Sequence, residues 1–315
     1  MKKPIVVLTG PTAVGKTELS IQLAKAIGGE IISADSMQVY KYMDIGSAKI
    51  TPEEMDGVRH YLVDELEPFD EFHVVKFQEY AQKYLNEIYA HEKIPIIAGG
   101  TGFYIQALLN DIDFTEQESD SAYRKELDAL AEEHGNQYLH DRLKEVDPES
   151  AEVIHPNNRK RVIRALEFFQ ETGRKISEHN AKEQMRTSPY NFAYFVLNDE
   201  RSHLYKRIDA RVDKMIEDGL EAEVRRLKEM GCTKDMVAMQ GIGYKEMLSY
   251  LDGGYSLEEA VYIIKRETRH FAKRQITWFK RERDVIWLNK NEFDYKNEAI
   301  LAYMIKILKE KAIIS

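Results

Sequence analysis

The stretch Ile5-Val6-Val7-Leu8-Thr9-Gly10-Pro11-Thr12-Ala13-Val14-Gly15-Lys16-Thr17 indicates how the first part of the chain folds. Residues 5–9 form a continuous apolar run that suits a strand covered on both faces. Residues 10–17 fit the phosphate-binding pattern G-x-x-x-x-G-K-[ST], and a helical pattern follows over residues 16–27. The loop therefore lies between a strand and a helix, as this motif requires, and it predicts that the protein binds a di- or triphosphate.

Each residue of this loop has a chemical reason to contact phosphate. Glycines let successive backbone N–H groups turn inward, and the start of a helix adds its dipole. Lys16 supplies a positive charge, and the Thr17 hydroxyl can coordinate Mg²⁺, the predicted cofactor. The predicted phosphate-binding residues are Gly10, Pro11, Thr12, Ala13, Val14, Gly15, Lys16 and Thr17.

Other nucleotide-binding motifs do not accompany the loop. Asn289-Lys290-Asn291-Glu292 ends in the wrong residue for a guanine-binding Asn-Lys-x-Asp motif, so a GTPase is not expected. Tyr61-Leu62-Val63-Asp64 has the outline of a Walker B strand. The same pattern arises wherever a strand ends at an acidic turn, and we favour that interpretation.

Two further strand ends carry residues suited to chemistry. Asp35 follows the apolar residues 30–33, where its carboxylate could orient Mg²⁺, cap a turn or act as a base; capping is the commonest of these roles. Residues 94–98 lead into Gly99-Gly100-Thr101, where glycines permit close backbone approach and Thr101 offers a hydroxyl. Ligands of open α/β folds bind at the carboxyl ends of strands, so we expect these three segments to converge on one crevice.

The order of predicted strands and helices defines the fold class. We predict an α/β protein, with a P-loop NTPase-like parallel sheet flanked by helices. Strand signals disappear between residues 113 and 189, which indicates an all-helical insertion at 114–189 within a core formed by 1–113 and 190–315. The predicted strands cover residues 5–9, 30–33, 94–98, 192–197 and 285–288, and the predicted insertion helices cover 121–133, 138–146 and 158–171.

Composition limits the class of protein. The 315 residues are 43% apolar and 31% charged, which suffices for a full core and excludes disorder. Cys232 is the single cysteine, so neither an internal disulfide framework nor a Cys-rich zinc site can form. No export signal and no apolar run of about 18 residues occurs, so we expect a soluble, cytoplasmic protein without a membrane partner.

The net charge of −9 argues against a nucleic-acid partner, but one segment has the opposite sign. Residues 262–283 contain eight Lys or Arg and two Glu, a local charge of +6 that leaves −15 for the rest of the chain. On the predicted helix Ile264, Phe271 and Trp278 would face the protein. A solvated charged helix is the simpler alternative, but the excess of positive charge favours a phosphate-binding face. The basic residues predicted to project outward are Lys265, Arg269, Lys273 and Lys280.

Several segments together resemble the tRNA dimethylallyltransferase family over nearly the whole chain. They are residues 10–17, Asp35-Ser36-Met37-Gln38-Val39-Tyr40, residues 43–49, Gly99-Gly100-Thr101, His155-Pro156-Asn157 with Arg161 and Arg164, and residues 272–278. The resemblance implies that the P-loop binds dimethylallyl diphosphate. It also implies transfer of the dimethylallyl group to N6 of the adenosine immediately 3′ of the anticodon (position 37), in tRNAs that read codons beginning with U.

The resemblance also implies roles for individual residues. Asp35 would accept the proton of the attacking amine, Lys16 would stabilise the leaving diphosphate, and Thr101 would lie beside the reacting carbon or the diphosphate. Arg211 resembles an arginine near the diphosphate, although a surface ion pair is weighted equally. The implied tRNA contacts are Asp35, Ser36, Met37, Gln38, Thr101, Arg124, Lys160, Arg161, Arg164, Lys273, Arg274 and Gln275.

The expected partners are the anticodon stem-loop of tRNA and dimethylallyl diphosphate, bound by a monomer. Lys160-Arg161-Val162-Ile163-Arg164 departs from the Gln-Arg-Leu-Ser-Arg of many bacterial relatives, which bears on base recognition. Two other functions compete with transfer. A small-molecule kinase using ATP would explain the P-loop but not the basic helix, and an RNA-binding module would explain the helix but not the P-loop with its acid.

Overall fold

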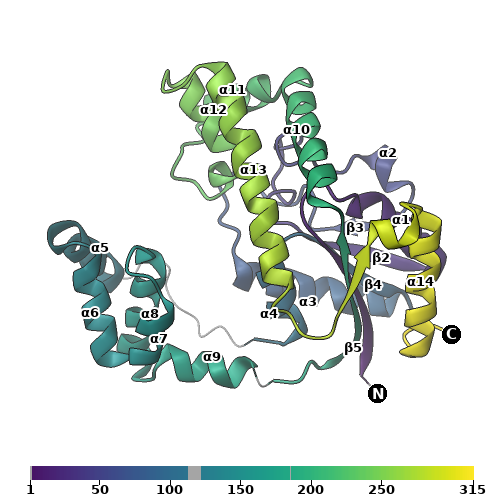
Figure 1. Cartoon of the computed structure of the whole chain (residues 1–315), viewed down its shortest axis with the longest axis horizontal. Coiled ribbons are helices and arrows are strands. Elements are labelled where there is room, and N and C mark those ends of the chain that lie inside the picture. Colours follow the sequence, from purple (N-terminus) through teal and green to yellow (C-terminus); the bar gives the residue numbers. More distant parts are fainter. Residues whose placement is uncertain (1, 113–121, 185) are drawn as a thin grey trace. The chain divides into compact units, whose positions relative to one another are not determined.

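The computed structural model describes residues 2–112, 122–184 and 186–315 (Figure 1). The chain separates into two compact units, Met1–Leu109 with Pro189–Ser315, and Asn110–Ser188. The boundary expected after residue 113 and the helix start expected at Ser121 lie outside the described residues. The second boundary was expected after residue 189 and falls one residue earlier.

A parallel sheet forms the centre of the first unit, with the strand order β3-β2-β4-β1-β5-β6 among the described residues. Every pair of neighbouring strands is parallel. The five predicted strands are confirmed, and the two-residue edge strand β3 is an addition. The strands are β1 (Lys3–Thr9), β2 (Gly29–Ala34), β3 (His60–Tyr61), β4 (Ile94–Gly99), β5 (Tyr190–Asn198) and β6 (Val285–Asn289).

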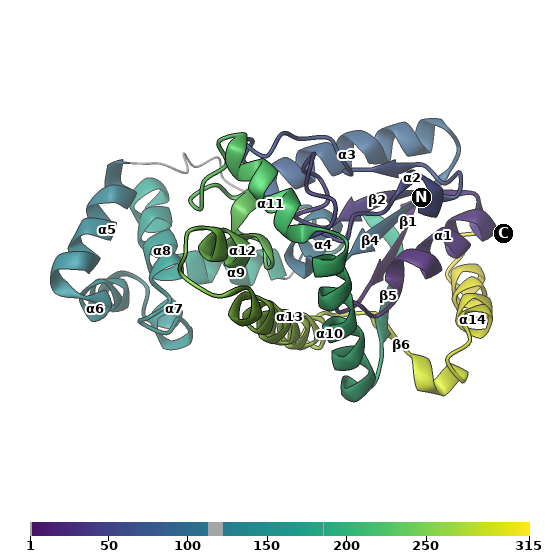
Figure 2. The same ribbon diagram turned by 90° about the horizontal axis from the view of Figure 1, so that it is seen from above.

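Helices cover both faces of this sheet, as the predicted α/β class requires (Figure 2). Along β1, Val6 and Leu8 pack in one apolar cluster while Ile5 and Val7 pack in another, because successive side chains point to opposite faces. The first face is covered by α1 (Lys16–Ile27) and α14 (Asn297–Glu310). The second is covered by α3 (Val74–Ala90) and α4 (Gly102–Leu109).

Three neighbouring strands end at the same level. Thr9 of β1 pairs with Gly99 of β4, and Gly99 also pairs with Ala34 of β2. The P-loop, Asp35 and the Gly100-Thr101 turn follow these three residues directly. The predicted convergence of three strand ends is therefore confirmed.

The basic segment lies on α13 (Leu257–Phe279), which begins earlier and ends sooner than the predicted span of 262–283. The Ser256 hydroxyl accepts a hydrogen bond from Glu259 N while the Glu259 carboxylate accepts one from Ser256 N, which fixes the start of the helix. Arg281 and Arg283 therefore lie beyond its end.

The predicted buried seam of α13 is wrong at Phe271, which is 36% exposed. A heptad spacing drifts by about 20° per repeat on a straight helix, so it does not keep one face against the protein. The prediction that Lys265 and Arg269 project into solvent is also wrong. Lys265 forms an ion pair with Asp213, and Arg269 forms one with Asp209, both on α10 (Arg201–Glu217). The observed buried residues are Ala260, Ile264, Thr268, Ala272, Gln275 and Phe279.

Two shorter helices pack beside α13 in this unit. Helix α11 (Leu220–Glu229) contacts α12 (Tyr244–Leu251), and α12 contacts α13. The 3-10 turn η1 (Ala238–Gln240) leads into a glycine turn at residues 240–244, whose last residue, Tyr244, starts α12. The remaining short elements are α2 (Pro52–Met55) and η2 (Lys290–Phe293).

The second unit is helical in all its described elements, with an apolar core that includes Leu127, Leu143 and Val162. The three predicted helices are confirmed as α5 (Ala122–His134), α6 (Asn136–Val146) and α8 (Arg159–Thr172). Sequence reasoning missed α7 (Pro148–Val153) and α9 (Ile176–Gln184). Asp147 ends α6 and also caps α7 by accepting a hydrogen bond from Ser150 N, and Pro148 takes the first position of α7. Among the helices described for both units, none has the length and apolarity needed to cross a membrane.

Candidate active site

A cavity of about 550 Å³ opens at the carboxyl edge of the sheet. The P-loop contributes Lys16 and Thr17 to its wall, the turn after β2 contributes Asp35 and Gln38, and α10 contributes Arg211. Residues predicted to bind phosphate and a residue predicted to move a proton therefore face one space.

The backbone of the P-loop requires glycine at two positions. Gly10 has φ of +149°, and a Cβ there would lie 2.2 Å from the Leu197 carbonyl oxygen of β5. Gly15 has φ of +97° at the N-cap of α1, a conformation that side chains disfavour. The loop also contains Ala13 at φ of +64°. The motif glycines thus set the curvature that turns the backbone around a ligand.

Two cations lie at this loop, Lys16 within it and Arg211 of α10 beside it. Lys16 Nζ donates to the carbonyl oxygens of Gly10 and Pro11, at 3.0 and 2.9 Å. Burial lowers the pKa of Lys16 to about 8, the Asp35 carboxylate opposes that shift, and the Arg211 guanidinium adds to it. Burial likewise lowers the pKa of Arg211. An anionic ligand would favour the charged form of both groups.

Arg211 contacts the P-loop itself. Its guanidinium donates to the Thr12 hydroxyl, and its Nε is buried with no hydrogen-bond partner among the described residues. The alternative of a surface ion pair is not realised, since the side chain turns into the cavity. An unpaired buried donor beside the loop is suited to a phosphate oxygen.

Asp35 has the capping role considered for it, and its second oxygen stays free within the described part of the chain. Its Oδ1 accepts hydrogen bonds from Met37 N at 2.8 Å and Gln38 N at 3.4 Å, so it caps the turn after β2. Its Oδ2 has no hydrogen bond within the described part of the chain. The capping contacts hold the carboxylate in place while one oxygen remains available to a ligand.

The donor set around the P-loop fits Mg²⁺ bound through a phosphate ligand. Thr17 lines the cavity and is exposed, and Asp35 lines the same space. No group of three or more His, Cys, Asp or Glu side chains suited to a metal occurs among the described residues. Mg²⁺ commonly retains several waters and binds through one or two protein groups plus phosphates, so the Thr17 hydroxyl together with phosphate oxygens would be sufficient.

Gln275 of α13 joins two of the converging strand ends. Its Oε1 accepts a hydrogen bond from Thr12 N, and its Nε2 donates to Gly100 O, both at 2.9 Å. The residue is 6% exposed, and a Cβ at Gly100 would lie only 2.3 Å from Nε2. We expected Gln275 to contact tRNA, which stays a prediction. In the structure its side chain instead holds the P-loop against the turn after β4.

Thr101 lies in that turn, and its backbone N–H donates to Ala34 O at 3.1 Å. The side chain is half-buried and does not line the cavity. Trp278 packs so closely on the next residue that a Cβ at Gly102 would lie 2.3 Å from the indole ring. Residues of α13 therefore fix the backbone on both sides of Thr101.

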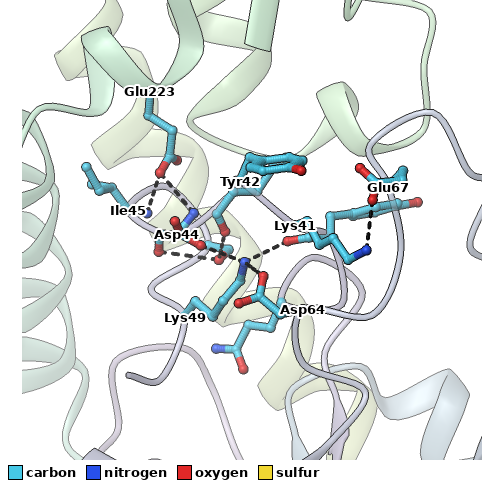
Figure 3. A network of polar contacts seen from close by, with 12 residues as sticks. Lys41, Tyr42, Asp44, Ile45, Lys49, Asp64, Glu67 and Glu223 are labelled. Carbon is cyan, nitrogen blue, oxygen red and sulfur yellow. Dashed lines mark hydrogen bonds and ion pairs between the residues drawn. The ribbon is translucent and has the colours of Figure 1, made fainter. Parts of the chain in front are cut away.

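The segment after Asp35 is held by charged residues that sequence reasoning did not identify (Figure 3). Glu223 of α11 accepts hydrogen bonds from the backbone N–H groups of Asp44, Ile45 and Gly46, at 2.9, 2.8 and 3.1 Å. Lys49 pairs with Asp44 and Asp64. Asp64 therefore serves this loop rather than a Walker B site, in line with the interpretation favoured from the sequence.

The residues predicted to meet the adenosine lie at the start of the same segment. Gln38 donates through Nε2 to Ala48 O at 3.1 Å and faces the cavity. Met37 packs on Gly241, where a Cβ would lie 2.6 Å from its terminal methyl group, and Ser36 is half-buried. The glycine turn 240–244 thus supports this segment through Gly241.

The predicted tRNA contacts on α13 differ from one another in exposure. Lys273 and Arg274 are both exposed, and the Arg274 guanidinium lies 5.8 Å from the centroid of the Phe271 ring. Exposed cations next to an exposed aromatic ring are suited to RNA phosphates and bases. The described structure therefore leaves this part of the helix accessible to a ligand.

The predicted contacts in the second unit lie on α5 and α8. Lys160 and Arg161 are exposed, while Arg164 is half-buried and burial lowers its pKa. Arg124 Nε donates to the buried Glu167 carboxylate at 3.1 Å. Arg124 and Arg164 are thus tied to the packing of this unit, whereas Lys160 and Arg161 project into solvent.

The Lys16 geometry makes anion binding depend on pH. Below about pH 8 Lys16 is charged in the free protein, and above it Lys16 must take up a proton to pair with an anion. We expect pyrophosphate affinity to fall by up to about tenfold per pH unit above pH 8, measured by titration calorimetry with Mg²⁺. The Lys16→Met variant should bind pyrophosphate more weakly, and it should not take up the proton that Lys16 takes up on binding above pH 8. If pyrophosphate affinity fell equally steeply with pH in the two proteins, Lys16 would not be the group responsible.

Comparison with known proteins places the chain among tRNA-modifying enzymes. The family model described as IPP transferase matches residues 38–282. The tRNA dimethylallyltransferase of Lachnoclostridium phytofermentans is 64% identical over 99% of both chains, and that of Acetivibrio thermocellus is 52% identical over 94% of this chain and 95% of its own. A crystal structure of the tRNA isopentenylpyrophosphate transferase from Bacillus halodurans has a TM-score of 0.74 at 45% identity, covering 99% of this chain and 98% of that one.

A eukaryotic dimethylallyltransferase acting on tRNA has a TM-score of 0.79 at 32% identity, with 91% of this chain and 74% of that chain covered. Both TM-scores indicate the same fold as this chain, and the family model begins at Gln38 and ends at Glu282, beyond the basic helix. The chain belongs to the IPP transferase family.

Proposed function

We propose that this protein transfers the dimethylallyl group of dimethylallyl diphosphate to N6 of the adenosine immediately 3′ of the anticodon (position 37) in tRNA. The observation that carries the proposal is that Asp35 and the P-loop cations line one cavity. Support comes from relatives named tRNA dimethylallyltransferase that are 64% and 52% identical to this chain. The products are N6-(dimethylallyl)adenosine and diphosphate.

The residues of the cavity suit each change in the reaction. The allylic C1–O bond breaks as the N6–C1 bond forms, and the attacking amine loses a proton that Asp35 Oδ2 accepts. The electron pair of the broken bond stays with diphosphate, whose increasing charge is stabilised by Lys16, Arg211 and the P-loop amides. Mg²⁺ held through Thr17 would add Lewis-acid stabilisation of that leaving group.

The tRNA is bound by surfaces outside the cavity. The adenosine leaves the base stack to reach Asp35, with the 36–38 segment beside it. Lys273 and Arg274 contact backbone phosphates of the anticodon stem-loop, and Lys160 and Arg161 contribute from the helical insertion. We further propose that the protein acts as a cytoplasmic monomer, because tRNA itself provides the large binding interface.

Label transfer tests the reaction directly. The protein is incubated with Mg²⁺, unmodified tRNA and dimethylallyl diphosphate labelled in the prenyl group, while ATP hydrolysis is followed in parallel. We expect label on one adenosine of the anticodon loop, and none on tRNA in which that position is guanosine. ATP turnover without labelled tRNA would instead support the small-molecule kinase.

Asp35→Asn separates the two roles of this carboxylate. The amide oxygen can still accept the hydrogen bonds from Met37 N and Gln38 N, so the turn should persist. Loss of the base should lower the single-turnover rate by roughly 10²- to 10⁴-fold and leave tRNA affinity within about twofold. Rapid-quench measurements at saturating substrates report the chemical step. A rate equal to wild type would restrict Asp35 to capping.

Salt dependence tests the exposed face of α13. Lys273→Ala and Arg274→Ala should each weaken tRNA binding and reduce the slope of log affinity against log salt by at most about 0.7 to 0.9. Lys309→Ala on α14 is the matched control, because this lysine is also exposed and lies on another helix. Unchanged slopes in both α13 variants would remove this face from the tRNA interface.

A further inference from the structure

Lys290 is a buried cation next to the P-loop, and the proposed function gives it no role. It follows β6 directly, at the start of η2, and the residue is 7% exposed. The ends of β5 and β6 are joined by a hydrogen bond from Asn198 Nδ2 to Asn289 Oδ1 at 3.0 Å. This contact fixes the backbone from which the Lys290 side chain extends.

The ammonium group of Lys290 contacts the loop between its two motif glycines. Nζ donates to Val14 O at 3.2 Å, and a Cβ at Gly15 would lie 3.3 Å from Nζ. The same Cβ would lie 3.4 Å from one terminal nitrogen of Arg207 on α10. Two cations therefore flank Gly15, and both Gly15 and Arg207 line the cavity.

Neither cation has a carboxylate within ion-pair distance in the described part of the chain. Burial lowers the pKa of Lys290, and the nearby Arg207 charge adds to that shift, while Asp199 and Glu18 oppose it from farther away. A buried charge without a partner costs free energy, and a neutral donor would suffice to hold the Val14 carbonyl. The positive charge is thus better explained by an anion that arrives with the ligand.

We propose that Lys290 is a positioning residue for the diphosphate, which it favours in two ways. It holds the P-loop through Val14 O, and together with Arg207 it adds positive charge beside Gly15 that Lys16 and Arg211 do not supply. This inference rests on the proposed function, since the diphosphate is its ligand. The charge acts on binding of the diphosphate more than on the chemical step, because it lies beside the loop and not at the reacting carbon.

The test compares Lys290→Gln, which removes the charge, with Lys290→Arg, which retains it. Titration calorimetry with inorganic pyrophosphate and Mg²⁺ should show roughly three- to thirty-fold weaker binding for Lys290→Gln and substantial recovery for Lys290→Arg. KM for dimethylallyl diphosphate should rise with the same ratio, while kcat and tRNA affinity change by less than about twofold. Lys296→Gln is the matched control, because Lys296 is exposed and only six residues away.

Two outcomes would overturn the inference: pyrophosphate affinity equal to wild type in Lys290→Gln, or equal losses in the Gln and Arg variants. Thermal melting of each variant identifies a folding defect. If Lys290→Gln does not fold, Arg207→Gln tests the effect of positive charge beside Gly15 on pyrophosphate affinity, because the Arg207 side chain is exposed. Failure of the proposed function has a different signature. In that case the wild-type protein would bind pyrophosphate more tightly than the Lys290→Gln variant does, yet the wild-type protein would not transfer label to tRNA.

Discussion

The close approach of backbone segments at the carboxyl edge of the sheet determines the rest of the site. A Cβ at Gly99 would lie 2.2 Å from Ala34 O, and a Cβ at Gly10 would lie 2.2 Å from Leu197 O. Four adjacent strands can therefore end together only because glycine occupies both positions. This packing brings the P-loop and Asp35, the proposed proton acceptor, to one cavity, so the arrangement of the site depends on glycine at these two positions.

Helix α13 connects this cavity with the surface that would meet RNA. Gln275 is buried and bonds both the P-loop and the turn after β4, whereas Lys273 and Arg274, two and one positions earlier in the helix, are exposed. One turn of α13 therefore both fixes the two loops through Gln275 and presents two cations at the surface.

The sequence was sufficient for features set by local patterns. The P-loop motif located α1, and the apolar runs located five strands, because buried parallel strands are continuously apolar. The sequence did not predict contacts between residues that lie far apart in the chain. The role of Gln275 depends on Thr12, and that of Lys290 on Val14, contacts that span most of the chain. A period-seven pattern also misplaced Phe271, since helical rotation and not residue type decides which side is buried.

The carboxylate of Glu223 accepts hydrogen bonds from three successive backbone N–H groups of the 44–46 segment (Figure 3). These contacts depend on the backbone conformation of the loop and not on its side chains. Glu223 comes nearly 180 residues later in the chain. During synthesis on the ribosome, the loop emerges long before the residue that fixes it. The three hydrogen bonds that Glu223 makes to this loop can therefore form only after α11 has left the ribosome.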